Sequence, residues 1–306
     1  MSAQPKHYVL LHVVVLIWGF TAILGLLMTI PPVEIVFYRT MIATLSLGLL
    51  LYLWKKPMKL GLRPAVYILL TGCIIAAHWI LFFGAARVAT ASVCLAGMAT
   101  SSLWTSFIEP FFYRKQVKYY EVALGLLAIV GLYIIFRFEF NHALGLAMAI
   151  ASAFLASLFT VINSKFTKSY FHYTITFYEM AGAFLFTLLF IPFYSAFISK
   201  GQVYWLPTAS DWMYLLILAL VCTVYAYSAS VELMKHVSAF AVNLTTNMEP
   251  IYGIVLALLI FGEDEQMTPG FYLGTAIILA SVLAYPVIRR YQRKKAAKAA
   301  LSHQQS

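Results

Sequence analysis

Ten stretches of about 20 apolar residues, separated by short polar breaks, constrain the fold of this chain more than any other feature. They cover residues 8–28, 32–54, 64–87, 89–113, 119–136, 144–164, 173–198, 210–234, 238–261 and 268–288. A helix needs about 20 such residues to cross the hydrocarbon core of a membrane. Charged residues make up only 10% of the chain, against about 25% in soluble domains. We therefore predict an all-α, polytopic membrane protein with ten transmembrane helices.

The placement of positive charge predicts the orientation of these helices. Cytoplasmic loops retain Lys and Arg. With the N-terminus inside, 17 of the 21 Lys and Arg residues fall on the cytoplasmic side. We therefore expect an N-in/C-in protein of the inner (cytoplasmic) membrane, with residues 291–306 forming a basic cytoplasmic tail that also touches anionic membrane lipid. Because the net charge of +10 is spread over inner loops and this tail, it does not indicate nucleic-acid binding.

Two similar strings lie 140 residues apart, "IVFYRTMIAT" from Ile35 and "ITFYEMAGAF" from Ile175. Later segments echo each other at a slightly larger spacing, such as "RVATA" and "KHVSA". These echoes predict two repeats, residues 1–140 and 141–290, although chance similarity between apolar helices is the alternative. Each repeat holds five spans, an odd number, so the second is inverted relative to the first. Inverted repeats suit alternating access around one central site.

Arg39 and Glu179 occupy matching positions in the two strings but carry opposite charges. Ionisable groups inside spans are candidates for function, because their burial in a bilayer is costly. At a rise of about 1.5 Å per residue, the inverted orientation separates them axially by about 10 Å. We therefore expect no direct salt bridge, and predict that they face one pathway from its two ends. The alternatives are that Arg39 snorkels to the headgroups and that Glu179 is solvated near a helix end.

The stretch "NLTTNMEP" places further polar groups near the middle of the ninth span. Glu249 lies deepest, and Asn243 and Asn247 precede it on nearby turns. Polar, proline-interrupted helices near the midplane form the binding sites of many transporters. Burial favours the neutral form of a carboxylic acid, so Glu249 could bind and release a proton near neutral pH. The sequence therefore allows transport coupled to protons but does not require it. The alternative is that these groups only hydrogen-bond neighbouring helices.

Trp18, His78 and Trp79 complete the predicted set of substrate-binding residues. His78 and Trp79 lie in the third span, where they would offer polar and aromatic contacts to a substrate. Trp18 lies in the first span and would line the same cavity. The alternatives are that the histidine is satisfied by a neighbouring helix and that the tryptophans serve packing or interface anchoring.

Motifs of catalysis and nucleotide binding are absent from the sequence. No G-x-x-x-x-G-K-[ST], H-E-x-x-H or G-x-S-x-G occurs. The three cysteines, Cys73, Cys94 and Cys222, fall inside apolar spans without a CxxC pattern. We therefore expect a protein that is not an enzyme and has neither a cofactor nor a metal site. A membrane channel or an intramembrane enzyme is the alternative class.

One set of short motifs is spread over both halves of the chain: Trp18-Gly19, Arg39, Pro250, Gly262-Glu263 and Gly274. Combined with ten spans, this set resembles the EamA-like branch of the drug/metabolite transporter superfamily, over nearly the whole chain. The first half departs from the family pattern, because Ser101 or Ser102 stands near the expected proline and Arg114-Lys115 replaces Gly-Glu.

The resemblance implies export of amino acids and related small metabolites. We accordingly predict a secondary transporter that moves a small polar molecule by alternating access. Its partners would be this small-molecule substrate and membrane lipid, with proton coupling left open and no nucleic acid. The sequence is compatible with a monomer or a homodimer.

Overall fold

The computed structural model describes residues 4–114, 116–138, 142–249, 252–253, 256, 259–260 and 268–304. Within these residues the chain forms helices and no strand. The helices are α1 (Pro5–Gly19), α2 (Thr21–Leu27), α3 (Pro32–Leu53), α4 (Leu62–Val88), α5 (Ala91–Met98), α6 (Ser101–Tyr113), α7 (Tyr119–Phe138), α8 (Ala143–Phe166), α9 (His172–Phe197), α10 (Ala209–Leu216), the π-helix η2 (Ile217–Tyr225), α11 (Ala226–Leu233), α12 (Ala239–Thr246) and α14 (Pro269–Gln304).

Seven helical stretches of the described chain are long and apolar enough to cross a membrane. They are Pro5–Leu27, Pro32–Leu53, Leu62–Val88, Ala91–Tyr113, Ala143–Phe166, His172–Phe197 and Ala209–Leu233. They match the first four predicted spans and the sixth to the eighth. Helix α7 covers the predicted fifth span, and α14 begins where the tenth was expected. The predicted ninth span lies only partly within the described residues, so the count of ten stays a prediction.

Side-chain exposure in the bundle is arranged as a lipid environment requires. Large apolar side chains stand on the outer faces of the helices, such as Leu45 and Leu49 on α3 and Leu189 on α9. Charged and polar side chains such as Arg39 and Thr223 are instead buried inside. Because hydrocarbon does not solvate charge, this distribution belongs in a membrane. The chain is therefore a multi-pass membrane protein.

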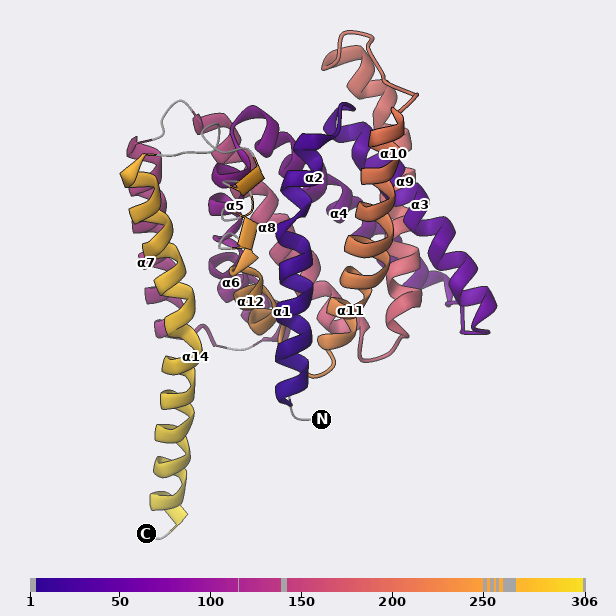
Figure 1. The fold of residues 1–306 in the computed structure, drawn as a ribbon. Helices are drawn as coiled ribbons and strands as arrows, with labels where there is room; N and C mark the ends of the chain where they lie inside the picture. The colour runs from indigo at the N-terminus through magenta and orange to yellow at the C-terminus, as the bar shows by residue number, and fades with distance from the viewer. Residues whose placement is uncertain are drawn as a thin grey trace.

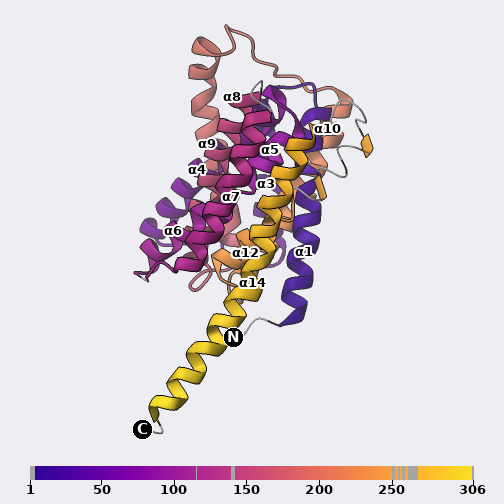
Figure 2. The same cartoon turned by 90° about the vertical axis from the view of Figure 1, so that its left-hand side faces the viewer.

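Helices α3, α4, α8 and α9 form the packed centre of the molecule, with α4 in contact with both α8 and α9. Helices α7 and α14 pair along one side of this bundle (Figures 1 and 2). Helix α14 continues well beyond the bundle, and both chain ends lie at the same end of the molecule (Figure 1). This arrangement agrees with an N-terminus and a C-terminus on one side. The predicted cytoplasmic side itself remains a prediction.

Glycines let α4 and α9 approach each other closely. A Cβ on Gly72 would overlap the carbonyl oxygen of Glu179, and one on Gly182 would overlap the carbonyl oxygen of Leu69. The backbones therefore touch where neither residue carries a side chain, as small residues allow in membrane helix pairs. The contact fixes the backbone of α9 at the position of Glu179.

Several of the predicted spans are interrupted rather than straight. The first is broken between α1 and α2 at Phe20, and the fourth between α5 and α6 at Ala99 and Thr100. Helix α12 ends at Thr246, and the eighth span passes through the π-helix η2. Such breaks and π segments release backbone groups from the helical ladder, and they occur often at functional sites. All four interruptions lie next to the central cavity described below.

Candidate functional site

A cavity lies in the middle of the bundle, lined by helices from both predicted repeats. Its volume is about 70 Å³, counted as space for the centres of water molecules. One water needs about 10–15 Å³ on that measure, so the cavity can hold several waters or a small solute. Its polar lining includes Thr21, Arg39, His78, Thr160, Tyr227, Ser230, Asn243, Thr246 and Glu249. Its apolar lining includes Trp18, Trp79, Phe82, Met98, Phe159 and Met234.

Arg39 faces this cavity from α3, and its side chain is only 2% exposed. Its Nε donates a hydrogen bond to Thr223 Oγ1 at 2.7 Å. Its guanidinium carbon lies 3.7 Å from the ring centroid of Trp79, a cation–π contact. Arg39 therefore does not snorkel to headgroups. Within the described residues the Nε bond is its only hydrogen bond, so its terminal amino groups remain available to an anion in the cavity.

The π-helix η2 supplies the groups that hold Arg39 and Trp18. Thr223 Oγ1 donates to the Leu218 carbonyl at 2.9 Å while it accepts from Arg39. The Cys222 carbonyl accepts a hydrogen bond from Trp18 Nε1 at 3.1 Å. The widened turn of a π-helix leaves such carbonyls without a partner in the helical ladder. A local distortion of the eighth span thus fixes two side chains that line the cavity.

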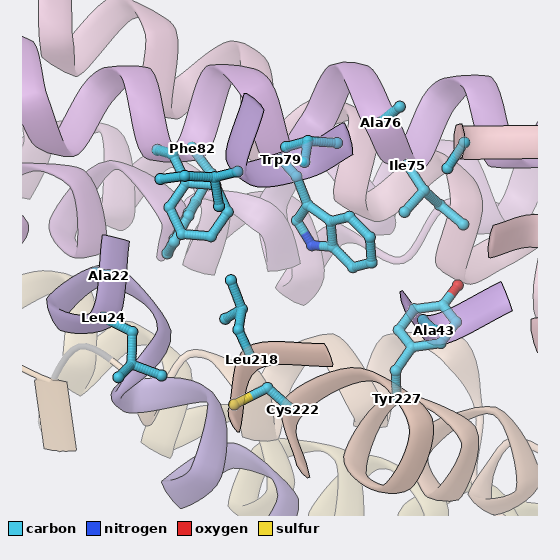
Figure 3. Packing of buried hydrophobic residues seen from close by; sticks show 14 of the residues in the cluster. Ala22, Leu24, Ala43, Ile75, Ala76, Trp79, Phe82, Leu218, Cys222 and Tyr227 are labelled. Atoms are coloured by element: carbon cyan, nitrogen blue, oxygen red, sulfur yellow. The ribbon is translucent and has the colours of Figure 1, made fainter. Parts of the chain in front are cut away.

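Two aromatic rings meet at the centre of the site, Trp79 from α4 and Tyr227 from α11. They project toward one another (Figure 3), with ring centroids 6.3 Å apart in an edge-to-face arrangement. Edge-to-face packing is a favoured geometry for aromatic pairs. The two rings separate the guanidinium of Arg39 from the carboxyl of Glu179, because Arg39 stacks on Trp79 and Tyr227 contacts Glu179.

Glu249 faces the cavity from the stretch that follows α12, and it is 5% exposed. Among the described residues its carboxyl makes neither a hydrogen bond nor an ion pair within 4.0 Å. The backbone of α1 comes close at this point, since a Cβ on Gly19 would lie 3.6 Å from the Glu249 carbonyl oxygen. Glu249 and Arg39 thus bring a carboxyl group and a guanidinium to one cavity without an ion pair within 4.0 Å between them.

His78 lines the cavity and also joins α4 to α8. Its Nδ1 contacts the Ser152 carbonyl at 3.0 Å and Ser152 Oγ at 2.7 Å, while Ser152 Oγ donates to the His78 carbonyl. Because a carbonyl can only accept, the contact assigns the ring proton to Nδ1. The neutral ring then presents Nε2 as an acceptor. The histidine therefore has both the structural role and the cavity position that the sequence left as alternatives.

Asn243 and Asn247 belong to a polar network between α6 and α12. Asn243 lines the cavity and donates from Nδ2 to Thr105 Oγ1 at 2.7 Å. Asn247 does not line it, and its Oδ1 accepts from Ser101 Oγ at 3.0 Å. The Nδ2 of Asn247 is buried without a partner among the described residues. These bonds hold α12 against α6, as expected for polar groups between membrane helices.

Glu179 lies beside the cavity rather than in its wall, and its side chain is 0% exposed. Its Oε2 accepts a hydrogen bond from the Tyr227 hydroxyl at 3.1 Å. That hydroxyl in turn accepts from Asn163 Nδ2 at 2.9 Å. The structure thus brings six of the eight predicted residues to the cavity, Trp18, Arg39, His78, Trp79, Asn243 and Glu249. Glu179 and Asn247 stand one residue behind it.

Tyr227 and Thr223 are functional-site residues that inspection of charge alone misses. Hydroxyl and aromatic side chains are common in membrane helices, so neither stands out in an apolar span. The spacing of the repeat offers a signal for one of them, because Tyr227 follows Trp79 by 148 residues, as "KHVSA" follows "RVATA". Pro250, Gly262 and Glu263 lie outside the described residues, so their predicted contribution stays a prediction. No cluster of three metal-ligating side chains occurs in the part of the chain that was described.

Comparison with known proteins places this architecture in a family. The model of the EamA-like transporter family matches residues 6–137 and again residues 143–285. Two transporters of Bacillus subtilis (strain 168), both described as uncharacterized, match nearly end to end. YxxF is 23% identical, with 95% of this chain and 93% of the relative covered. YetK is 26% identical, with 95% and 90% covered.

A solved crystal structure shares the fold. It matches with a TM-score of 0.70 at 15% sequence identity, and the match covers 94% of this chain and all of the other. The overall backbone is therefore one already observed by crystallography. The two matches of the family model together span both halves of the bundle around the cavity. The chain belongs to the EamA-like transporter family.

Proposed function

We propose that the protein is a secondary transporter of the cytoplasmic membrane that exports small polar metabolites such as amino acids by alternating access. The observation that carries this proposal is the pair Arg39 and Glu249. A buried cation and a buried carboxyl line one cavity, and neither is paired with a described group. Burial of an unpaired charge is costly, so a bound solute that offers both charges would relieve both. A zwitterion has that chemistry, with its carboxylate at Arg39 and its ammonium group at Glu249.

Geometry around Arg39 suits a carboxylate ligand. Arginine presents its donors in a planar fork that matches the two oxygens of a carboxylate. The Nε bond to Thr223 and the stacking on Trp79 fix the plane of the fork. A fixed fork loses little freedom when a substrate binds, and this preorganisation favours affinity.

Pairwise similarity between the halves supports two inverted repeats, residues 1–140 and 141–290. Arg39 precedes Glu179 by 140 residues, and Trp79 precedes Tyr227 by 148. In each half the ionisable residue of the second span contacts the aromatic residue of the third.

The helices α5 and α12 provide a second, independent parallel between the halves. Both are eight residues long. Both begin after a hydroxyl residue whose side chain caps the helix, Thr90 in one and Ser238 in the other. The two caps are 148 residues apart. Discontinuous helices in corresponding positions of two halves are typical of alternating-access transporters. The boundary at residues 140 and 141 lies outside the described residues.

Uptake into proteoliposomes tests the transport proposal directly. Purified protein is reconstituted, and a panel of labelled amino acids is supplied with and without a pH gradient. We expect saturable uptake of at least one member. Non-saturable flux would indicate a channel, and chemical turnover in detergent would indicate an enzyme. If no amino acid showed saturable flux, the amino-acid proposal would be wrong.

Glu249→Gln is the matching variant for the carboxyl in the cavity. Because a hydrogen bond to a charged group contributes about 1.5–3 kcal/mol, we expect its half-saturation concentration to rise about 10- to 100-fold. Glu232→Gln serves as the control, since Glu232 lies outside the cavity and its side chain is 49% exposed. Equal behaviour of the two variants would remove Glu249 from the binding site.

A further inference from the structure

Glu179 is an acid enclosed inside the bundle. Its side chain is fully buried, and it lies outside the wall of the cavity. The Tyr227 hydroxyl donates a hydrogen bond to its Oε2, and the Asn163 side chain lies beside the same carboxyl. The second oxygen, Oε1, is buried without any partner there. The neighbouring Asn163 Oδ1 is also a buried oxygen without a partner.

No cation compensates Glu179 in the part of the chain that was described. The helices packed against α9 are α3, α4 and α11. From α3, Arg39 contacts Thr223 and Trp79 and makes no ion pair with Glu179, and from α11 the titratable neighbour is Tyr227. From α4, the backbone at Gly72 covers the Glu179 carbonyl, and neither Cys73 nor His78 bonds its carboxyl.

One histidine–carboxyl contact does lie along α9, two turns before Glu179. It joins His172 Nε2 and Glu232 Oε2 at 3.5 Å near the helix start. Both of its members are engaged with each other, so they do not compensate Glu179. A carboxylate in an enclosed site without a cation is strongly disfavoured, whereas the neutral acid is tolerated.

We propose that Glu179 is a proton-binding site, separate from the substrate cavity, that is loaded with a proton in this conformation. Tyr227 connects it to the cavity, because its ring lines the cavity and its hydroxyl contacts the acid. On release, the Tyr227 hydroxyl first turns its hydrogen from Glu179 Oε2 toward the cavity. The O–H bond of the carboxylic acid then breaks as the Tyr227 oxygen accepts that proton, and the former hydroxyl proton passes to water in the cavity. Glu179 is left as a carboxylate that accepts from Tyr227, and loading is the reverse.

Glu179 and Arg39 occupy equivalent positions in the two proposed repeats, and this equivalence gives the proton site a place in the transport cycle. That role rests on the transport function proposed above. Arg39 and Glu249 line the substrate cavity, and a zwitterionic substrate adds no net charge to it. A charge change at Glu179 instead alters the environment of Tyr227, whose ring contacts Trp79 and, through it, Arg39. Proton release at Glu179 is therefore coupled to the substrate site through two packed aromatic rings.

Infrared spectroscopy tests the proton site without any substrate. Spectra of the purified protein in lipid bilayers at neutral pH are compared for the wild type, Glu179→Gln and the control Glu232→Gln. A protonated carboxylic acid has a carbonyl band at higher frequency than the amide bands. We expect the wild type and Glu232→Gln to show this band. In Glu179→Gln we expect the intensity of the band to fall by the contribution of one carboxylic acid. An undiminished band in Glu179→Gln would overturn the proposal.

A second variant decides the question even where Glu179→Gln does not insert or fold. Tyr227→Phe keeps the acid but removes the hydroxyl that donates to Oε2. We expect the carboxylic-acid band of Tyr227→Phe to shift to higher frequency, since a carbonyl loses its hydrogen bond. A band at the wild-type frequency would mean that the protonated acid is not Glu179, and would overturn the proposal.

Coupling is tested with each amino acid of the panel that shows saturable uptake. For Glu179→Gln we expect loss of accumulation driven by a pH gradient, while counterflow exchange stays within about twofold of the wild type. Gradient-driven accumulation at the wild-type level, or loss of both activities, would overturn the coupling role. If no amino acid of the panel is transported, the proposed function fails, while the infrared result still decides whether Glu179 holds a proton.

Discussion

Arg39 has a structural role that its contacts show and a binding role that we propose. Its Nε and its flat face contact Thr223 and Trp79, and the residue lines the cavity. Lysine keeps the charge but offers neither the fork nor the planar surface. We therefore expect Arg39→Lys to raise the half-saturation concentration for uptake about 10- to 100-fold, the loss of one charge-assisted hydrogen bond.

Thr223→Val provides the control for this prediction. It removes the acceptor of the Nε bond but leaves the guanidinium and its contact with Trp79. We expect a smaller effect, about 3- to 10-fold, because the Nε bond orients the guanidinium and does not itself contact the substrate. Arg39→Lys with wild-type half-saturation would show that the guanidinium does not bind substrate. The measurement is initial uptake rate against substrate concentration in proteoliposomes.

Charge in an apolar span is the sequence signal that identified this site. Arg39 and Glu249 were predictable because few ionisable residues stand so deep in a span, and both line the cavity. The expected depth of Glu179 in its span was less informative. Depth along the helix does not reveal that Tyr227 lies between this side chain and the cavity. Glu109 shows the same limit at another position, since its Oε2 accepts a hydrogen bond from the Phe240 amide at 2.9 Å. That partner is distant in sequence and could not be inferred from spacing.

At the scale of helices, the contact between α4 and α9 carries a direct prediction. Gly72 and Gly182 each lie against the backbone of the other helix. A methyl group there would force the helices apart, and overpacking of this kind costs about 1–3 kcal/mol. We expect Gly72→Ala and Gly182→Ala each to lower the apparent Tm in detergent, and to lower transport because α9 carries Glu179.

Gly61→Ala is the matched glycine control for this pair. A Cβ on Gly61 would meet only Pro64, at 3.7 Å, which is an ordinary contact. We expect its Tm to stay within the error of the wild type. Equal Tm values for Gly72→Ala and Gly61→Ala would contradict the close approach of α4 and α9.

Hydrophobic runs predicted the described spans to within a few residues but not their interruptions. Pro32 and Leu62 begin helices close to the expected positions, because turn residues and charges mark the ends of apolar runs. The break at Phe20 and the π-helix that follows Leu216 lie inside uniformly apolar sequence. The spacing and the number of apolar residues do not distinguish a regular α-helix from one that contains a π-helical turn. These features depend on partners such as Trp18 and Arg39, which are far away in the chain.

For the whole molecule, the distribution of Lys and Arg predicts a topology that labelling can check. Lys200 lies in the exposed loop after α9, on the side predicted to be outside, and Lys56 lies in the loop after α3, predicted to be inside. In a background without native cysteines, we expect a membrane-impermeant maleimide to label Lys200→Cys in intact cells. Lys56→Cys should react only after the membrane is permeabilised. The opposite pattern would reverse the predicted orientation.

A cluster of hydrogen bonds closes the end of the bundle that lies away from the chain termini. The fully buried Asp211 accepts from the Thr29 amide at 2.7 Å and from Thr29 Oγ1 at 2.6 Å, and also caps α10 through Thr208. Arg87 donates to the carbonyls of Gly25, Met28 and Ile30. The turn between α2 and α3 is thus tied to both α10 and α4. In an alternating-access cycle these ties must separate when the cavity opens on this side.

Weakening this closure should therefore expose the cavity to the outside. Asp211→Asn keeps one carbonyl acceptor but loses the charge that strengthens its bonds, and we expect about 1.4 kcal/mol of destabilisation of the closed form. A shift of that size changes the ratio of open to closed molecules about tenfold. The readout is the labelling rate of Thr21→Cys, a cavity position, by an external maleimide in the background without native cysteines. We expect that rate to rise about tenfold, while labelling of Lys200→Cys, already exposed, stays unchanged. An unaltered Thr21→Cys rate would show that Asp211 only caps α10, and that the outer closure depends on other contacts.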